Sequence, residues 1–269
     1  MKKMKLVSVR NIMAMAVVGL GVAVTPGVAK ADFVDFTVNE NVVPGMAGLG
    51  GTFVADQLVG SYNEVITFDG VGGFTTNAYA TWVGYNRLDG TVPVSNAIDV
   101  EEGTDVFEYG LYALFSSTGT IAGNVFTGGT SQFSLWVDPD VNTVNSLGPT
   151  GASPLGQAGG GEDLLVASGN ILLSGFGVAS NVGGFFDLVF AQPTFTAFGS
   201  SFMSGLNGLL FNATIDGDLD EFEFTGTQTI TGQLSAQFEP VPEPASLALL
   251  GMGLLGVVAV ARRRRKVVA

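Results

Sequence analysis

Three alternating aspartates, Asp216, Asp218 and Asp220, form the stretch of the sequence best suited to binding a metal ion. Carboxylate oxygens at every second position can converge on one calcium ion, as at the start of a calcium-binding loop. The stretch departs from an EF-hand, because Glu221 stands where the loop needs a glycine and Thr227 where it needs a bidentate glutamate. Calcium is therefore a possible ligand, and an acidic hairpin turn that leads into the next strand is the favoured alternative.

Other carboxylates occur in short groups that are typical of turns. Asp138 and Asp140 flank a proline, and Asp99, Glu101 and Glu102 form a second group. Several such loops at one end of a β-domain could share a calcium ion, which is a weaker hypothesis. Paired carboxylates can also hydrolyse a glycosidic bond. A carboxylate-dependent enzyme that cleaves polysaccharides is thus an alternative function. The favoured prediction is that the protein is not an enzyme.

The sequence has neither cysteine nor histidine. This excludes a cysteine nucleophile, a Ser-His-Asp triad, an imidazole-based zinc site and a haem held by histidine. In the domain it leaves carboxylates, hydroxyls, amides and one arginine, Arg87, for catalysis. Five aromatic residues could stack on sugar rings if they are exposed, which would favour a carbohydrate-binding module. Most of them are instead expected to pack in the core. They are Trp82, Tyr85, Tyr109, Tyr112 and Trp136.

Short strands must position these side chains, because apolar runs alternate with Gly, Asn, Asp and Pro. In residues 222–238 all the apolar side chains fall on even positions, and the odd positions hold polar residues, mostly Thr and Gln, so one face is buried. Gly226 and Gly232 indicate a turn or bulge there. Further strands are predicted at 52–59, 64–68, 75–84, 106–116, 121–126, 132–137, 164–167, 185–191 and 209–215. We expect an all-β fold, an antiparallel β-sandwich of Greek-key or jelly-roll type.

Turns and loops are predicted from the small and polar residues. Asp-Gly pairs at 69–70, 89–90 and 216–217 are typical of hairpin turns. Residues 149–161 and 199–208 read as loops. The wider tract 142–161 is interpreted as a long surface loop in preference to a linker between two subdomains.

The N-terminus is predicted to be a signal peptide, residues 1–31. Basic residues precede an apolar run at 12–24 that is shorter than a membrane span, and Ala29 and Ala31 supply the small residues that a signal peptidase reads. Cleavage after Ala31 is expected, and the alternative is an uncleaved anchor. Residues 32–239 then form the exported domain.

Residues 240–269 are predicted to be a C-terminal sorting tail, with a proline-rich motif, an apolar span and a basic cluster. Prolines at 240, 242 and 244 end the strand pattern. Residues 245–261 are uncharged and apolar, about 25 Å long as a helix and marginal for a bilayer core of roughly 30 Å. A basic cluster follows and is expected to hold the C-terminus in the cytoplasm. It contains Arg262, Arg263, Arg264, Arg265 and Lys266.

The basic residues at the two ends of the chain offset much of the negative charge of the domain between them. Between residues 32 and 240 one basic residue, Arg87, stands against 23 acidic ones, so the formal charge is near −22 instead of the −13 of the whole chain. Such a surface repels nucleic acid and anionic lipid headgroups, so neither is expected as a partner. Divalent cations and salt are expected to affect its stability.

The tail resembles the PEP-CTERM sorting signal of Gram-negative bacteria. Val241, Pro242, Glu243 and Pro244, the Gly-rich apolar span and the four arginines match it in order and spacing. The resemblance implies that an exosortase, a membrane protease-transpeptidase, cuts near the Pro-Glu-Pro core and releases the protein to the cell surface or the extracellular matrix. The membrane would then be a partner only before processing.

The domain is similar to the flocculation-associated members of the PEP-CTERM group. The residues that carry this resemblance are 51–56, 62–65, 109–115, 135–140 and 163–169. It implies a structural role in which the protein holds cells together within an exopolysaccharide matrix, with exopolysaccharide or neighbouring cell surfaces as partners.

Overall fold

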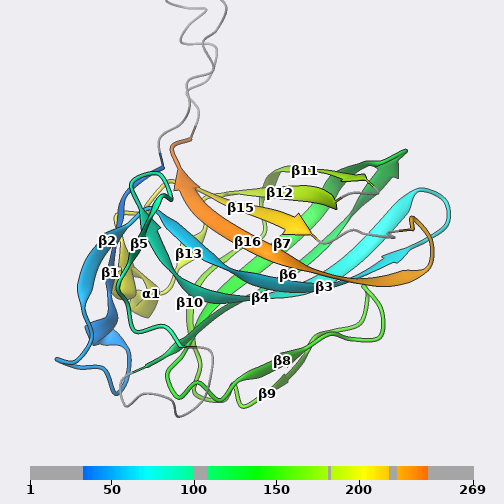
Figure 1. Cartoon of the computed structure of the whole chain (residues 1–269). Coiled ribbons are helices and arrows are strands. Elements are labelled where there is room, and N and C mark those ends of the chain that lie inside the picture. The colour runs from blue at the N-terminus through cyan, green and yellow to red at the C-terminus, as the bar shows by residue number, and fades with distance from the viewer. Residues whose placement is uncertain (1–32, 100–107, 181–182, 218–222, 242–269) are drawn as a thin grey trace, which may run out of the picture. The chain divides into compact units, whose positions relative to one another are not determined.

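The computed structural model describes residues 33–99, 108–180, 183–217 and 223–241, which are almost entirely strands and their connections (Figure 1). The predicted all-β class is confirmed. The strands of the main sheet are β3 (Gln57–Phe68), β4 (Gly73–Arg87), β5 (Val92–Val94), β6 (Gly110–Ala122), β7 (Val125–Asp138), β10 (Leu164–Gly169), β11 (Leu172–Ser180), β12 (Gly183–Ala191), β13 (Thr194–Phe195), β15 (Leu210–Gly217) and β16 (Thr227–Glu239).

The main sheet closes on itself. Its strands follow the order β11-β12-β15-β16-β3-β4-β6-β7, and β7 then pairs with β11 through Phe126 and Gly177. All the named strands pair antiparallel. The expected sandwich of two packed sheets is not confirmed, because the pairing of β7 with β11 joins what would be the two edges. Closure leaves fewer unpaired strand edges than an open sheet has.

Every second side chain along the strands points to the inside of this closed sheet. Along β4 the buried residues Phe74, Thr76, Ala78, Ala80 and Trp82 alternate with less buried ones. The alternation predicted for residues 222–238 is present from the start of β16 onward. The strand begins at Thr227 because Gly226 adopts a left-handed φ of 66° in the preceding turn. Gly232 remains within the strand.

Several local predictions need correction. The predicted strand 121–126 spans the turn between β6 and β7, where Gly123 has a φ of 64°. The predicted loop 199–208 contains part of α1 (Ala197–Phe202) and all of β14 (Met203–Ser204), and no strand was predicted over β11. The turn at residues 89–90 is confirmed, since the buried Asp56 carboxylate accepts hydrogen bonds from the amides of Asp89 and Gly90.

A smaller sheet lies at one end of the domain and contributes to the same core. It consists of β1 (Phe36–Asn39), β2 (Thr52–Ala55) and β14, and α1 and the 3-10 helix η2 (Glu40–Val42) lie beside it. Phe36 packs edge-on against Tyr85 of β4 and Phe238 of β16. Among the described residues, no helix has the length and apolar character needed to cross a membrane.

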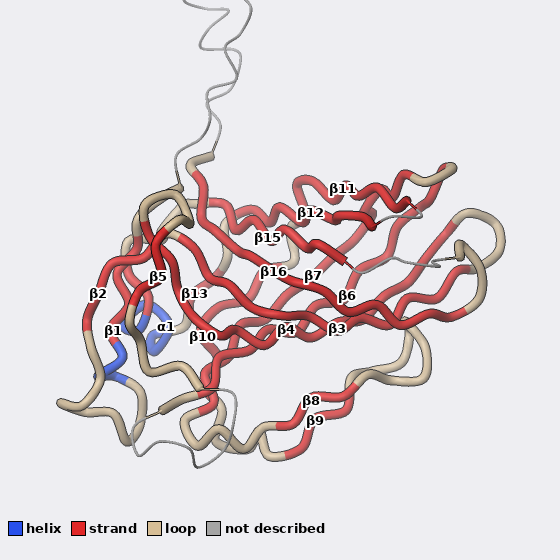
Figure 2. Tube along the Cα trace, viewed as in Figure 1, coloured by secondary structure: helices blue, strands red, loops and turns tan. Residues whose placement is uncertain are grey.

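The tract 142–161 forms an arm on the outside of the sheet, which we call the β8–β9 arm. It carries the short strands β8 (Val144–Ser146) and β9 (Gly156–Ala158) (Figure 2). The strands on either side of the tract, β7 and β10, pair directly with each other. The surface-loop interpretation is therefore confirmed, and the linker alternative is wrong.

Candidate functional site

The sorting tail begins where the folded domain ends. β16 stops at Glu239, and Pro240 and Val241 are exposed. The amide of Val34 donates a 3.1 Å hydrogen bond to the carbonyl of Phe238, so the described chain enters the domain beside the point where the tail leaves it. The rest of the predicted motif, Pro242, Glu243 and Pro244, lies outside the described residues, as do the arginines at 262–265.

Of the three predicted calcium ligands, the structure describes Asp216. Asp216 is exposed near the end of β15, where it pairs with Phe185 and Gln233 of the neighbouring strands. Asp218 and Asp220 lie outside the described residues. The signal-peptide residues Ala29 and Ala31 also lie outside them, so cleavage after Ala31 stays a prediction.

A different acidic cluster forms from Asp138, Glu162 and Asp163, whose nearest carboxylate oxygens lie within 4.8 Å of one another. Asp138 is the last residue of β7, and the other two immediately precede β10. The antiparallel pairing of Val137 with Leu164 places these distant parts of the chain side by side. We call these three residues the acidic cluster.

The surrounding hydrogen bonds fix the carboxylates in place. Asp138 accepts from the amides of Asp140 at 3.2 Å and Thr143 at 2.8 Å. Asp163 accepts from the hydroxyl of Tyr112 at 2.5 Å and from Thr143 Oγ1 at 2.9 Å. These bonds orient the cluster before any ligand arrives.

The electrostatics of the cluster disfavour three negative charges. Burial raises the pKa of Asp163, and the charges of Asp138 and Glu162 raise it further, while hydrogen bonds from Tyr112 and Thr143 act in the opposite direction. Glu162 Oε1 and Asn142 Oδ1 are buried without a hydrogen-bond partner. Carboxylate and amide oxygens are the ligands that calcium prefers. The cluster could hold a hard divalent cation.

Sequence reasoning recognised only one half of this cluster. The spacing of Asp138 and Asp140 favours a turn, and Asn142, two positions further on, extends the alternation of oxygen ligands. Nothing local indicated that Glu162 and Asp163 would join them. That information lies in the pairing of β7 with β10.

The aromatic residues considered for sugar stacking are mostly buried. Trp82, Tyr85 and Tyr109 are at most 1% exposed, which excludes them as sugar platforms and confirms the core alternative. The Tyr112 ring is also buried and lies nearly parallel to the Trp136 ring, with centroids 6.5 Å apart.

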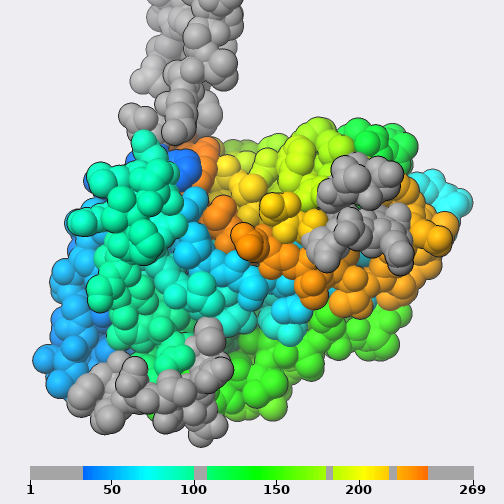
Figure 3. Space-filling view, viewed as in Figure 1, coloured from blue at the N-terminus to red at the C-terminus, as the bar shows by residue number. Residues whose placement is uncertain are grey.

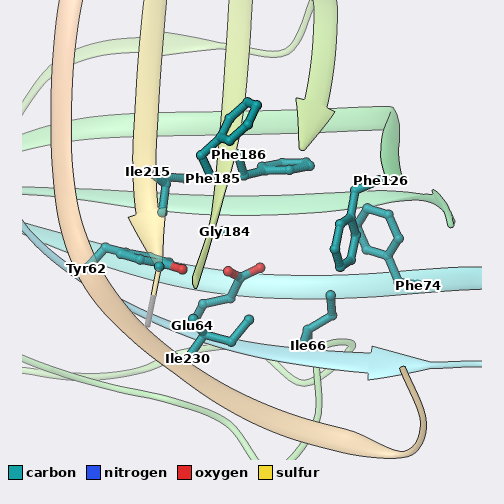
Figure 4. A pocket seen from close by; sticks show the side chains of 11 residues that line it. Tyr62, Glu64, Ile66, Phe74, Phe126, Gly184, Phe185, Phe186, Ile215 and Ile230 are labelled. Carbon is teal, nitrogen blue, oxygen red and sulfur yellow. The ribbon is translucent and has the colours of Figure 1, made fainter. Parts of the chain in front are cut away.

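One carboxyl points into the closed sheet. Glu64 lies between Tyr62 and Ile66 on the inner face of β3, and Phe186 faces it across a cavity of about 40 Å³ (Figure 4). The hydroxyl of Thr76 donates to Glu64 Oε1. Burial raises the pKa of Glu64. The cavity has room for a water molecule beside the carboxyl, but it is much smaller than a pocket for an organic ligand.

Comparison with known proteins identifies the tail. Residues 240–265 match the family model described as the PEP-CTERM protein-sorting motif. The predicted sorting signal is therefore confirmed, and it implies export and processing by an exosortase. No curated protein matches the chain. No solved structure matches it either.

Proposed function

We propose that the processed protein is a component of the cell surface or extracellular matrix that promotes cell aggregation in association with exopolysaccharide. The single observation that carries this proposal is the PEP-CTERM motif at residues 240–265, which directs the domain outside the cell. The motif begins at the exposed residues Pro240 and Val241, which supports the proposal because a processing enzyme needs access to the backbone near this point.

The resemblance to flocculation-associated proteins adds a second line of support. Its residues belong to the framework of the domain. Residues 109–115 lie mainly in β6, 135–140 include the end of β7, and 163–169 include β10. These three strands are adjacent in the main sheet. The resemblance therefore involves the folded core instead of one surface loop.

We propose binding in preference to catalysis. Asp138, Glu162 and Asp163 can each turn one carboxylate oxygen toward a common point, with these oxygens within 4.8 Å of one another, which is the arrangement that a bound divalent cation needs. Asp163 is also engaged by Tyr112 and Thr143, which stabilise its charged form where it stands. The cluster suits cation binding better than glycosidic bond cleavage.

The test is a deletion of the gene followed by a settling assay of the culture. We expect slower settling with an unchanged amount of exopolysaccharide, and recovery when the intact gene is returned. A second strain should carry the gene with Glu243→Ala and Pro244→Ala, which leave the domain intact and alter only the sorting motif. Settling that is unaffected by the deletion, with exopolysaccharide intact, would contradict the aggregation role.

A further inference from the structure

A groove runs across the outer face of β4, β6 and β7 beside the β8–β9 arm. It consists of two pockets with volumes of about 660 and 610 Å³. The pockets are continuous, because Asn77, Ser116, Gln132 and Asn170 line both of them. Each volume is in the range of small-molecule sites. We call this feature the outer groove.

The arm beside the groove is held firmly to the sheet. Asn77 Nδ2 donates to the carbonyls of Gly151 at 2.7 Å and Ser153 at 2.9 Å. The amide of Gly151 donates to Thr67 Oγ1 at 2.9 Å, and a Cβ at this glycine would overlap the carbonyl of Thr75. In the space-filling view the arm packs against the strands above it (Figure 3). The groove is therefore formed in advance, which reduces the entropy cost of binding.

Three primary amides in one pocket of the groove are free to bind a ligand. The side chains of Gln132, Asn170 and Gln192 are exposed and have no hydrogen-bond partner within the described ranges. Gln192 also has a backbone φ of 45°, in the left-handed region that non-glycine residues rarely adopt. Such strained residues concentrate at functional sites. Each amide can donate and accept, so the pocket matches ligand groups that do both.

The charge of the groove differs from that of the domain. None of the described residues that line the two pockets is ionisable, although the domain has a formal charge near −22. An anionic ligand would be repelled by the surrounding field, and a cation would bind the carboxylates elsewhere. An apolar ligand would bury the three amides without partners, at a cost in free energy. The groove therefore favours an uncharged polar ligand.

A peptide fits this site less well than a sugar chain. Extended peptides commonly bind by adding a strand to a free sheet edge, where backbone groups are available. The outer groove lies on a sheet face, and the backbone groups of β6 are already paired with β4 and β7 on both sides. Its lining offers side-chain amides and hydroxyls, together with exposed Ile171 for the C–H face of a ring.

We propose that the outer groove binds a segment of an uncharged polysaccharide, whose hydroxyl groups pair with the amides of Gln132, Asn170 and Gln192. This inference rests on the proposed matrix function for the source of the polysaccharide, and it adds the ligand class and the binding site. The two continuous pockets, of about 660 and 610 Å³, together have room for more than one sugar unit.

Affinity electrophoresis of the purified protein tests this proposal. The gels contain the extracellular polysaccharide of the producing cells, separated by anion exchange into a neutral and an acidic fraction. We expect the neutral fraction to retard the protein and the acidic fraction to leave its mobility unchanged. The double variant Gln132→Ala/Asn170→Ala should lose at least about fivefold in affinity. Gln233→Ala is the matched control, because Gln233 is exposed on β16 outside both pockets.

Three results would overturn the proposal: no retardation by the neutral fraction, stronger retardation by the acidic fraction, or equal affinities of the double variant and the wild type. A circular dichroism melt of each variant confirms that its fold is unchanged. The settling assay separates this inference from the proposed function. Neutral-glycan binding together with normal settling after gene deletion would keep the groove and reject the aggregation role. Slower settling after gene deletion, without binding of the neutral glycan, would keep the aggregation role and reject the groove as a glycan site.

Discussion

The hydroxyl of Tyr112 donates a 2.5 Å hydrogen bond to Asp163 Oδ2, and this bond connects the centre of the main sheet to the acidic cluster. Tyr112 lies on β6 and pairs with Trp136 of β7, whereas Asp163 immediately precedes β10. Burial raises the pKa of Tyr112, and the hydrogen bond to Asp163 raises it further. The bond thus links β6 to the segment that carries the acidic cluster between β7 and β10.

Calcium is predicted to stabilise the domain through this cluster. A cation would offset the repulsion among the three carboxylates and could bind the buried Glu162 Oε1, which has no hydrogen-bond partner among the described residues. Binding to the native state alone contributes about 2.7 kcal/mol at a ligand concentration 100-fold above Kd. Calorimetry with millimolar calcium should therefore give a higher melting temperature than calorimetry with a chelator.

Two single-residue variants test whether the acidic cluster is the site of the calcium effect. Asp163→Asn should abolish most of the increase, whereas Asp216→Asn should retain it, because Asp216 is exposed on β15, away from the cluster. An equal increase in both variants would locate the effect in the overall charge of the domain instead of the acidic cluster.

Stability is predicted to fall as the pH rises through the folded-state pKa of Glu64. Burial raises this pKa above its unfolded value, so the folded state binds the proton more tightly. The stabilising contribution is complete below the unfolded pKa, near 4.5, and is lost as the carboxyl ionises inside the sheet. Glu64→Gln should therefore be more stable than the wild type at pH 7 and lose that advantage near pH 4.

Thermal melts from pH 4 to pH 8 measure this difference. One kcal/mol corresponds to roughly 2–4 °C for a domain of this size. Glu223→Gln is the control, because it makes the same chemical change at an exposed side chain. Parallel profiles of Glu64→Gln and the wild type would contradict the prediction.

Asn77 is predicted to hold the β8–β9 arm on the sheet. Asn77→Ala removes both side-chain donors to Gly151 and Ser153 and leaves their carbonyls without these partners. The expected cost is about 1–3 kcal/mol in local stability. Hydrogen exchange of residues 148–155 should accelerate, while exchange in β16 stays slow. Asn63→Ala, on the neighbouring strand β3, is a suitable comparison, and equal protection of the arm in all three proteins would contradict the role.

Processing at both ends is predicted to produce a mature chain that starts at Asp32 and has lost its C-terminal arginines. Intact-mass measurement of the exported protein checks both ends at once. The variant with Glu243→Ala and Pro244→Ala should retain the apolar span and the basic cluster, and remain in the membrane fraction. A mature mass that still includes Arg262 to Arg265 would show that the motif is not cut.

Local properties of the sequence determined the class of the fold and the destination of the protein. Period-two alternation in β4 and β16, the turn at Asp89-Gly90 and the composition of the tail depend on residues close together in the chain. A strand must bury its apolar face whatever its neighbours are, so alternation is readable without knowing the partner strand. The sorting motif is likewise a short linear signal.

Only the tertiary structure decided which strands are neighbours. Closure through Phe126 and Gly177, the meeting of Asp138 with Asp163, and the packing of residue 151 against Thr75 all join segments that are far apart in the chain. Strand pairing depends on the combined burial and hydrogen bonding of the whole sheet, and no single segment contains that information. For the same reason, the sequence could single out Asp138 as one of several acidic residues, but it indicated neither the acidic cluster nor the amides that line the outer groove.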